Sequence, residues 1–374
     1  MRFSYKAFLL VGMVIASLNN AQALETAART AVIRDFTTGR ILFEKDSHTR
    51  VPTASMSKMM TMYMVFDALK KGDLHMDQML PVSERAWKSE GSRSFLNVGS
   101  QAKVEDLIRG VIIQSGNDAT VVFAEGLAGS ETAFAERMNK KLAELGIKDS
   151  HFVNASGLPE PDHYSTAFDL LMIGEHLIRD FPDDYKFYSE KDFTYNDTKQ
   201  GNRNPLLYAN IGADGIKTGH TKEAGYGLVG SAVQNGQRIS MVVTGLPSMA
   251  ARKDESIKLM DWAFKSFHLV NVFKPGQKVA DAEVWLGQSP RVNLTVAKEL
   301  PVALGWNEKD SVKAKIEFQE PLPAPLTKGQ EVGKLTVELP GMEAVSVPLV
   351  AAEDVAIKGG FDRAMAAIKG LLKS

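Results

Sequence analysis

Residues 52–72 read PTASMSKMMTMYMVFDALKKG, and this stretch carries the strongest structural signal in the chain. From Met56 to Leu69 the residues are apolar on nearly every side, which is typical of a helix buried in a domain core. Lys70 and Lys71 match the negative end of the helix dipole, and Gly72 suits the position after the last turn. The pattern predicts a buried helix that begins just after Ser55.

Ser55 and Lys58 stand three residues apart at the start of this helix, and therefore on one face of it. Free backbone N–H groups and the positive end of the dipole stabilise an oxyanion at such a position. A lysine acts as a base only when it is neutral, and burial or a second cation lowers its pKa. The pair predicts a serine nucleophile with a lysine base, and Lys217 is the expected second cation.

Two further short motifs accompany this pair, but each motif is weak alone. Ser115-Gly116-Asn117 joins two predicted helices, and Lys217-Thr218-Gly219 precedes a late hairpin. A second Ser-x-x-Lys motif, Ser100 to Lys103, lies in a polar turn where Ser100 is expected to cap a helix. The order and structural context of the three motifs make their combination specific.

The pattern around these motifs predicts an antiparallel sheet covered by helices. Asn235-Gly236 is the strongest short hairpin signal, and β-like, helical and again β-like segments follow one another along the chain. Asn117 or Asp118 is expected to cap a helix that starts near Ala119. The expected strands are Ala31–Asp35, Arg40–Lys45, Gly225–Val233 and Arg238–Gly245, and the expected helices include Val104–Ile112 and Ser256–Phe267.

The remaining chain predicts three more segments. A basic start, the apolar run Ala7–Ser17 and the small residues Ala21 and Ala23 predict a signal peptide cleaved after residue 23. From about Phe273, short alternating runs between Pro and Gly turns predict a small all-β domain. An apolar stripe flanked by cations predicts an amphipathic tail helix. The predicted boundaries are 1–23, 24–268, 269–354 and 355–374; the β-like runs are Lys278–Leu286, Arg291–Val296, Ser311–Phe318 and Lys334–Leu339, and the stripe is Phe361, Met365, Ile368 and Leu372.

Composition excludes several classes of function. The 374 residues suit two domains, and a net charge of −1 gives no reason to expect nucleic acid as a partner. The chain has no cysteine, which excludes thiol nucleophiles and thiolate metal sites. No His-Glu-x-x-His, Gly-x-Ser-x-Gly or nucleotide-binding glycine loop is present, so neither a metal nor a cofactor is expected.

Taken together, the three motifs resemble the active-site motifs of penicillin-binding proteins and serine β-lactamases. Neighbouring residues are similar to those of the low-molecular-mass D-alanyl-D-alanine carboxypeptidases over essentially the whole chain. The resemblance implies an α+β fold of the β-lactamase/D,D-peptidase type, with a small all-β domain and an amphipathic helix after it. It rests on residues 52–61 (PTASMSKMMT), 154–158 (NASGL), 163–167 (HYSTA) and 214–221 (DGIKTGHT).

This resemblance also implies residue roles. Ser55 would be acylated, Lys58 would take its proton, and Ser115 and Asn117 would relay protons and hold the substrate amide. Lys217 and Thr218 of the Lys217-Thr218-Gly219 motif would support proton return and bind the terminal carboxylate. The N–H groups of Ser55 and His220 would form the oxyanion hole. Arg252 resembles an arginine near the carboxylate pocket, although a solvated residue is the alternative, and for Arg203 the solvated alternative is favoured.

The implied activity is removal of the terminal D-alanine from peptidoglycan stem peptides, with β-lactams as covalent inhibitors. A D,D-endopeptidase that cuts cross-links shares the motifs and remains an alternative, as does a non-catalytic peptidoglycan-binding scaffold. A β-lactamase is disfavoured because no glutamate between the second and third motifs has the expected Glu-x-x-Leu-Asn setting. The expected location is the cell envelope, peripheral on the outer face of the cytoplasmic membrane through the tail.

Overall fold

The computed structural model describes residues 4–10, 24–306, 308, 311–339 and 342–360. The chain divides into two compact units, Gln22–Lys265 and a second unit formed by Met1–Ala21 with Ser266–Ser374. The division between the larger and smaller units falls at Lys265, whereas the sequence predicts it after residue 268. The predicted tail helix lies outside the described residues from position 361 onward.

The larger unit is built on a five-stranded sheet in the order β3-β2-β10-β9-β8, in which each pair of neighbours is antiparallel. Asn235 and Gly236 have φ angles of 49° and 78°, as a type I′ turn requires, so the predicted hairpin is confirmed. The last strand in this order lies at the edge of the sheet. The strands are β2 (Thr30–Asp35), β3 (Ile41–Lys45), β8 (Ala213–Thr221), β9 (Gly225–Gln234) and β10 (Gln237–Leu246).

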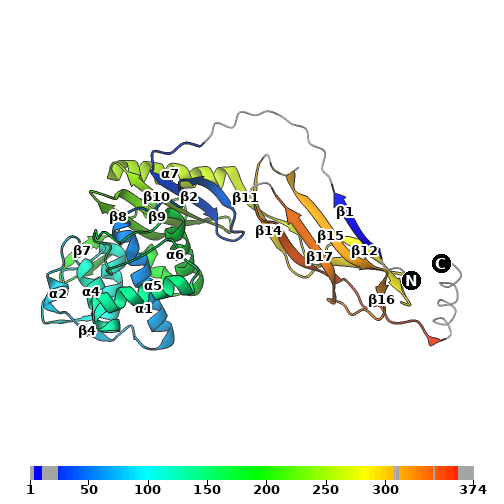
Figure 1. Ribbon diagram of the computed structural model, residues 1–374, viewed down its shortest axis with the longest axis horizontal. Helices are drawn as coiled ribbons and strands as arrows, with labels where there is room; N and C mark the ends of the chain where they lie inside the picture. Colours follow the sequence, from blue (N-terminus) through cyan, green and yellow to red (C-terminus); the bar gives the residue numbers. More distant parts are fainter. Residues whose placement is uncertain (1–3, 11–23, 307, 309–310, 340–341, 361–374) are drawn as a thin grey trace. The chain divides into compact units, whose positions relative to one another are not determined.

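Helices cover both faces of this sheet (Figure 1). On one face α6 packs against β2, β9 and β10, and α1 packs against α6. On the other face lies α7, whose Trp262 ring is 6.2 Å from the Phe43 ring of β3. The α+β fold is therefore confirmed. The main helices are α1 (Lys58–Lys71), α3 (Val104–Arg109), α4 (Asn117–Ala128), α5 (Glu131–Glu144), α6 (Ala167–Asp180) and α7 (Met249–Ser266).

Shorter elements connect these helices and strands; one of them contains the predicted nucleophile Ser55, and another ends just before Ser115. The 3-10 turn η1 (Ala54–Ser57) precedes α1, and the π-helical turn η2 (Gly110–Gln114) follows α3. The others are β4 (Met79–Pro81), α2 (Glu84–Trp87), β5 (Gln101–Lys103), η3 (Asp184–Ser189), β6 (Asp192–Tyr195), β7 (Thr198–Gly201) and η4 (Pro205–Tyr208).

Two predicted helix caps are wrong. The N-cap of α4 is Gly116, and the carboxylate of Asp118 accepts hydrogen bonds from the N–H groups of Ser94 and Leu96. Asp118 thereby holds a distant loop in addition to its own helix. Ser100 does not cap α3, because its hydroxyl donates to the carbonyl of Asn97 at 2.7 Å. The N-cap of α3 is Lys103, which provides no side-chain hydrogen bond.

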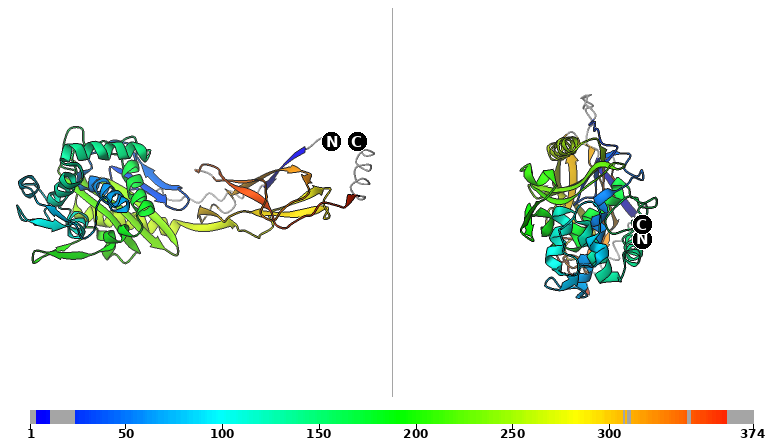
Figure 2. Two further views of the ribbon diagram at one scale, coloured as in Figure 1. Left: turned by 90° about the horizontal axis from the view of Figure 1, so that it is seen from below. Right: turned by 90° about the vertical axis from the view of Figure 1, so that its left-hand side faces the viewer.

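The smaller unit is all-β between residues 267 and 358, as predicted (Figure 2). Its main sheet has the order β1-β15-β17-β18-β13-β12-β16, and β11 pairs with β14 separately. Residues Ser4–Leu10, within the predicted leader, form the edge strand β1, antiparallel to β15. The strands are β1 (Ser4–Leu10), β11 (Phe267–Phe273), β12 (Ala280–Trp285), β13 (Arg291–Val296), β14 (Leu300–Gly305), β15 (Lys313–Glu320), β16 (Leu322–Pro323), β17 (Glu331–Glu338) and β18 (Val345–Ala351).

Candidate active site

Ser55 lies in η1, the tight turn that leads into α1, and its side chain is half-buried. The N–H of Met56 donates to the carbonyl of Thr53 at 3.2 Å and closes the turn. The α-helix itself begins at Lys58, two residues later than the sequence predicts. This turn places the Oγ of Ser55 2.8 Å from the Nζ of Lys58, so the predicted nucleophile and base are in contact.

Lys58 is fully buried at the first position of α1. Its Nζ donates to the Oγ of Ser55 and to the backbone carbonyl of Ser156, the latter at 2.5 Å. Burial, followed by the positive charge of Arg203, lowers the pKa of Lys58 to about 7, although Asp118 acts in the opposite direction. A large share of Lys58 is therefore neutral near pH 7, as a general base requires.

After burial, the cation that lowers the pKa of Lys58 is Arg203, whereas the sequence predicts Lys217 in that role. The side chain of Arg203 lines the same cavity as Ser55, and one of its terminal nitrogens donates to the Oγ of Ser92 at 2.7 Å. Arg203 is exposed to solvent, as the favoured alternative expects, and it also lines the cavity.

Ser115 and Lys217 form a second hydroxyl–amine pair. Ser115 follows η2 with a φ of 66° and is buried, and Lys217 lies on the buried part of β8. The Nζ of Lys217 donates to the Oγ of Ser115 at 3.0 Å. Burial, then the charges of Lys58, Arg203 and Arg252, hold the pKa of Lys217 well below its usual range. Both lysines are therefore set up to exchange protons with a hydroxyl group.

Asn117 fastens a neighbouring loop to the site. Its backbone N–H donates to the carbonyl of Ser92 at 2.7 Å, and its Nδ2 donates to the carbonyl of Glu90 at 2.6 Å. Its Oδ1 is buried and has no hydrogen-bond partner among the described residues. This oxygen is an acceptor without a donor, and a ligand N–H group would satisfy it.

The motif on β8 approaches the nucleophile turn closely. A Cβ atom built on Gly219 would lie 2.9 Å from the carbonyl oxygen of Thr53 and 3.2 Å from the Cβ of Ala54. Glycine at this position therefore lets the strand pass against η1. The next residue, His220, stacks its ring on Tyr226 with centroids 3.8 Å apart. The side chain of Thr218 is nearly buried but still lines the cavity.

Arg252, in the first turn of α7, has only 4% of its surface exposed. Its guanidinium lies 5.7 Å from the centre of the Tyr226 ring and donates to the carbonyl of Arg203 at 3.4 Å. Its Nε has no hydrogen-bond partner among the described residues. The alternative of a solvated Arg252 is therefore excluded by its burial.

These groups meet at a cavity of about 530 Å³. Lys58 and Lys217 reach it through Ser55 and Ser115, and Asn117 holds a loop that contributes Ser92 to its wall. Several of the lining residues were not predicted, because they come from distant segments without a recognisable motif. The lining residues are Ser55, Ser92, Ser115, Asn202, Arg203, Pro205, Tyr208, Thr218, Gly219, His220, Tyr226, Met249 and Arg252.

The loop that accepts the Lys58 hydrogen bond has its own close contact with the nucleophile turn. Gly157 has a φ of 82°, and a Cβ built on it would lie 1.9 Å from the carbonyl oxygen of Ala54. Asn154 braces the loop by accepting from the N–H of Gly157 at 2.8 Å. Glycine is therefore required here both for its backbone conformation and for space.

We expect Gly157→Ala to lower the free energy of unfolding by roughly 3 kcal/mol, since it combines backbone strain with overpacking. Gly146→Ala is the matched control, because Gly146 has a φ of 76° and nothing within 4 Å of an added Cβ. It isolates the strain, which costs roughly 1 kcal/mol. Urea unfolding measures both. Equal losses in the two variants would show that the Ala54 contact is unimportant.

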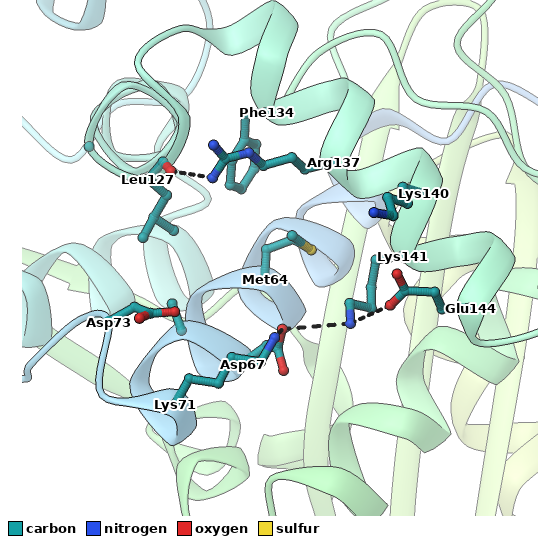
Figure 3. Close-up of a pocket in the computed structure, with 12 residues that line it drawn as sticks. Met64, Asp67, Lys71, Asp73, Leu127, Phe134, Arg137, Lys140, Lys141 and Glu144 are labelled. Atoms are coloured by element: carbon teal, nitrogen blue, oxygen red, sulfur yellow. Dashed lines mark hydrogen bonds and ion pairs between the residues drawn. The ribbon is translucent and has the colours of Figure 1, made fainter.

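A second cavity, of about 410 Å³, lies between α1, α4 and α5 (Figure 3). Its charged residues largely pair with each other. Asp67 binds Lys71 at 2.7 Å and Lys141 at 3.7 Å, and Arg137 donates to the carbonyl of Leu127. Unlike the Ser55 cavity, it contains no nucleophile with an adjacent base, so it is not the centre of the chemistry.

Comparison with known proteins agrees with this geometry. Residues 17–248 match the model of the D-alanyl-D-alanine carboxypeptidase family, and residues 267–356 match that of the penicillin-binding protein 5 C-terminal domain. A D-alanyl-D-alanine carboxypeptidase DacA of Haemophilus influenzae is 40% identical, with 93% of this chain and 91% of the relative aligned. A DacC enzyme of Escherichia coli is 37% identical over 95% of this chain and 91% of its own length.

Among solved structures, penicillin-binding protein 5 from Haemophilus influenzae superposes with a TM-score of 0.77 at 40% sequence identity. The alignment covers 90% of this chain and 99% of that structure. The aligned region therefore includes most of both units of this chain. The chain therefore belongs to the D-alanyl-D-alanine carboxypeptidase family of serine peptidases.

Proposed function

We propose that this protein is a serine-type D-alanyl-D-alanine carboxypeptidase, which removes the terminal D-alanine from peptidoglycan stem peptides through an acyl-enzyme on Ser55. The observation that carries this proposal is the contact of the Ser55 hydroxyl with a buried lysine whose pKa is lowered to about 7. The family of the chain supports the substrate class.

The first half of the reaction forms the ester. Ser55 Oγ attacks the carbonyl carbon between the two D-alanines while its proton passes to Lys58 Nζ. The oxyanion is expected to be held by the N–H groups of Ser55 and His220. When the C–N bond breaks, the leaving D-alanine amine receives a proton, for which the Lys217–Ser115 pair is a suitable route.

The second half releases the product. Water attacks the ester carbon, gives one proton to a basic group, and Ser55 leaves as the restored hydroxyl. Penicillin resembles the dipeptide and acylates Ser55 in the same first step, by opening of its β-lactam ring. Its retained amine cannot diffuse away as D-alanine does, so the acyl-enzyme persists and labels the protein.

Recognition of the substrate terminus follows from charge. Arg203 and Arg252 line the cavity, and after burial and the charge of Lys58 their charges lower the pKa of Lys217. This positive region suits the terminal carboxylate of the peptide. Thr218 would donate its hydroxyl to the same carboxylate. The unpaired Oδ1 of Asn117 would accept an N–H group from the peptide bond of the substrate.

The test is to identify the products from two substrates. The mature protein is incubated with a soluble pentapeptide precursor and, separately, with a cross-linked peptide dimer, and mass spectrometry follows both. We expect free D-alanine from the precursor and little cleavage of the dimer. Preferential cleavage of the dimer would establish the endopeptidase alternative instead, and absence of turnover and labelling would favour a binding scaffold.

Acylation should depend on pH through Lys58. Because the base must be neutral, the acylation rate constant should fall about tenfold for each pH unit below about 7 and level off above it. Rapid-quench labelling with a fluorescent penicillin between pH 5 and pH 9 measures this profile. A rate constant that is flat down to pH 5 would contradict a Lys58 base.

We also propose that the protein is exported and lies on the outer face of the cytoplasmic membrane. None of the helices in the described ranges combines the length and apolar character needed to cross a bilayer. The leader prediction for residues 1–23 supports export. Because β1 is an edge strand that, among the described strands, pairs only with β15, cleavage after residue 23 removes none of the described interior strands.

Peripheral binding is proposed for the tail stripe of Phe361, Met365, Ile368 and Leu372, which lies outside the described residues. Each large apolar side chain contributes roughly 1.5–3 kcal/mol if fully buried, so binding should be reversible. Truncation after Gly360 should abolish flotation with anionic vesicles and leave peptide hydrolysis unchanged. The truncation must lie beyond Lys358, because the N–H of Lys358 donates a hydrogen bond to the carbonyl of Leu286. Equal flotation of both forms would refute a membrane role.

A further inference from the structure

A buried chain of hydrogen bonds lies behind the nucleophile turn. The Oγ of Ser57 is 2.5 Å from the Oγ1 of Thr53 and 2.7 Å from the Nε2 of His163. Thr53 and Ser57 are almost fully buried, and His163 has only 5% of its surface exposed. The steps of the proposed reaction do not use any of these three side chains.

The tautomer of His163 follows from its second nitrogen. The backbone N–H of Val153 donates to Nδ1 at 3.2 Å, so Nδ1 has a free lone pair. The proton is therefore on Nε2, which donates to Ser57. Burial, then the charges of His151 and Lys58, lower the pKa of His163 to about 4, and the ring is neutral near pH 7.

Through these two bonds His163 ties two segments that both touch Lys58. On one side Ser57 precedes Lys58 in the chain. On the other side Val153 begins the loop in which the carbonyl of Ser156 accepts from Lys58 Nζ at 2.5 Å. Phe152, next to Val153, packs its ring 5.1 Å from the ring of His163.

We infer that His163 is a positioning residue that holds the Ser156 carbonyl against Lys58, which keeps the base dehydrated and aimed at Ser55. This inference rests on the proposed role of Lys58 as base. Burial is the largest cause of the lowered Lys58 pKa. If the loop moves away, water reaches Nζ and a larger share of the lysine is protonated at neutral pH.

The test compares His163→Ala, His163→Gln and the control His151→Ala by the pH profile of acylation with a fluorescent penicillin. His151 is on the same loop but binds the carbonyl of Asp162 rather than the nucleophile turn. We expect His163→Ala to slow acylation at pH 7 roughly 10- to 100-fold. The acid limb of its pH profile, where the acylation rate constant falls, should move to higher pH by about one unit. Glutamine offers an acceptor and a donor, so it should recover most of the rate and the profile, and the control should match the unchanged protein.

Thermal unfolding is recorded in parallel, because a purely structural histidine would lower the melting temperature and leave the acid limb in place. That result would overturn the inference. If His163→Ala does not fold, Ser57→Ala breaks the same chain of hydrogen bonds with a smaller loss of side-chain volume. The acid limb of its pH profile should move up in the same way. An unchanged acid limb in Ser57→Ala would also overturn the inference. The Lys58→Arg variant separates the two proposals. If it is acylated normally, Lys58 is not the base. If it is not acylated while His163→Ala is acylated normally, only the positioning role of His163 is refuted.

Discussion

Replacement of Ser55 by alanine is expected to abolish covalent labelling by penicillin and to reduce peptide hydrolysis by about a millionfold. The Oγ of Ser55 is the atom that would form the ester, and it accepts a hydrogen bond from Lys58. The side chain is half-buried, and its loss leaves Lys58 bound to the carbonyl of Ser156. The fold should therefore survive, with a change in stability of about 1 kcal/mol or less.

Intact-protein mass spectrometry and thermal unfolding measure the two parts of this expectation. Ser100→Ala is the matched control, because Ser100 begins the other Ser-x-x-Lys motif and its hydroxyl donates to the nearby carbonyl of Asn97. It should label normally. A penicillin adduct on the Ser55→Ala protein would refute the assignment of the nucleophile.

Lys58→Arg is expected to slow acylation by several orders of magnitude, about 10³-fold or more. Arginine keeps the positive charge, but its guanidinium does not lose a proton within proteins, so the base is removed. The larger head group must also fit where Nζ now lies between Ser55 and the carbonyl of Ser156. Time courses of fluorescent penicillin labelling at neutral pH measure the loss.

The matched control is Lys103→Arg, in the second Ser-x-x-Lys motif. Lys103 is partly exposed and pairs with Glu105 at 2.7 Å, an interaction that arginine preserves. Acylation should be normal in this variant. Near-normal acylation of Lys58→Arg would instead transfer the role of base to Lys217, the other buried lysine bound to a serine hydroxyl.

The parts of the fold that were predictable are those with a local cause. The hairpin at Asn235-Gly236 follows from two residues that tolerate positive φ, and the burial of α1 follows from an apolar surface on nearly every side. The contact of Ser55 with Lys58 follows from their three-residue spacing. Although the turn is 3-10 rather than α-helical, both geometries keep such residues on one side.

The rest of the site depends on contacts between distant segments, which leave no local pattern. The acceptor for Lys58 at Ser156 is a backbone carbonyl, and every residue type has one. Gly116 caps α4 because the Asp118 carboxylate is engaged by the loop at Ser94. Strand β14 was not predicted because Leu300–Gly305 is apolar almost throughout and lacks the alternation of a half-buried strand.

The gathering of Lys58, Lys217, Arg203 and Arg252 around one cavity has a consequence for the stability of the folded protein. In the empty cavity, burial and the neighbouring positive charges disfavour protonation of the two lysines, and a bound carboxylate would offset these charges. Any ligand that binds only the folded state draws molecules away from the unfolded one. A ligand that places a carboxylate in this cavity should therefore raise the melting temperature of the protein.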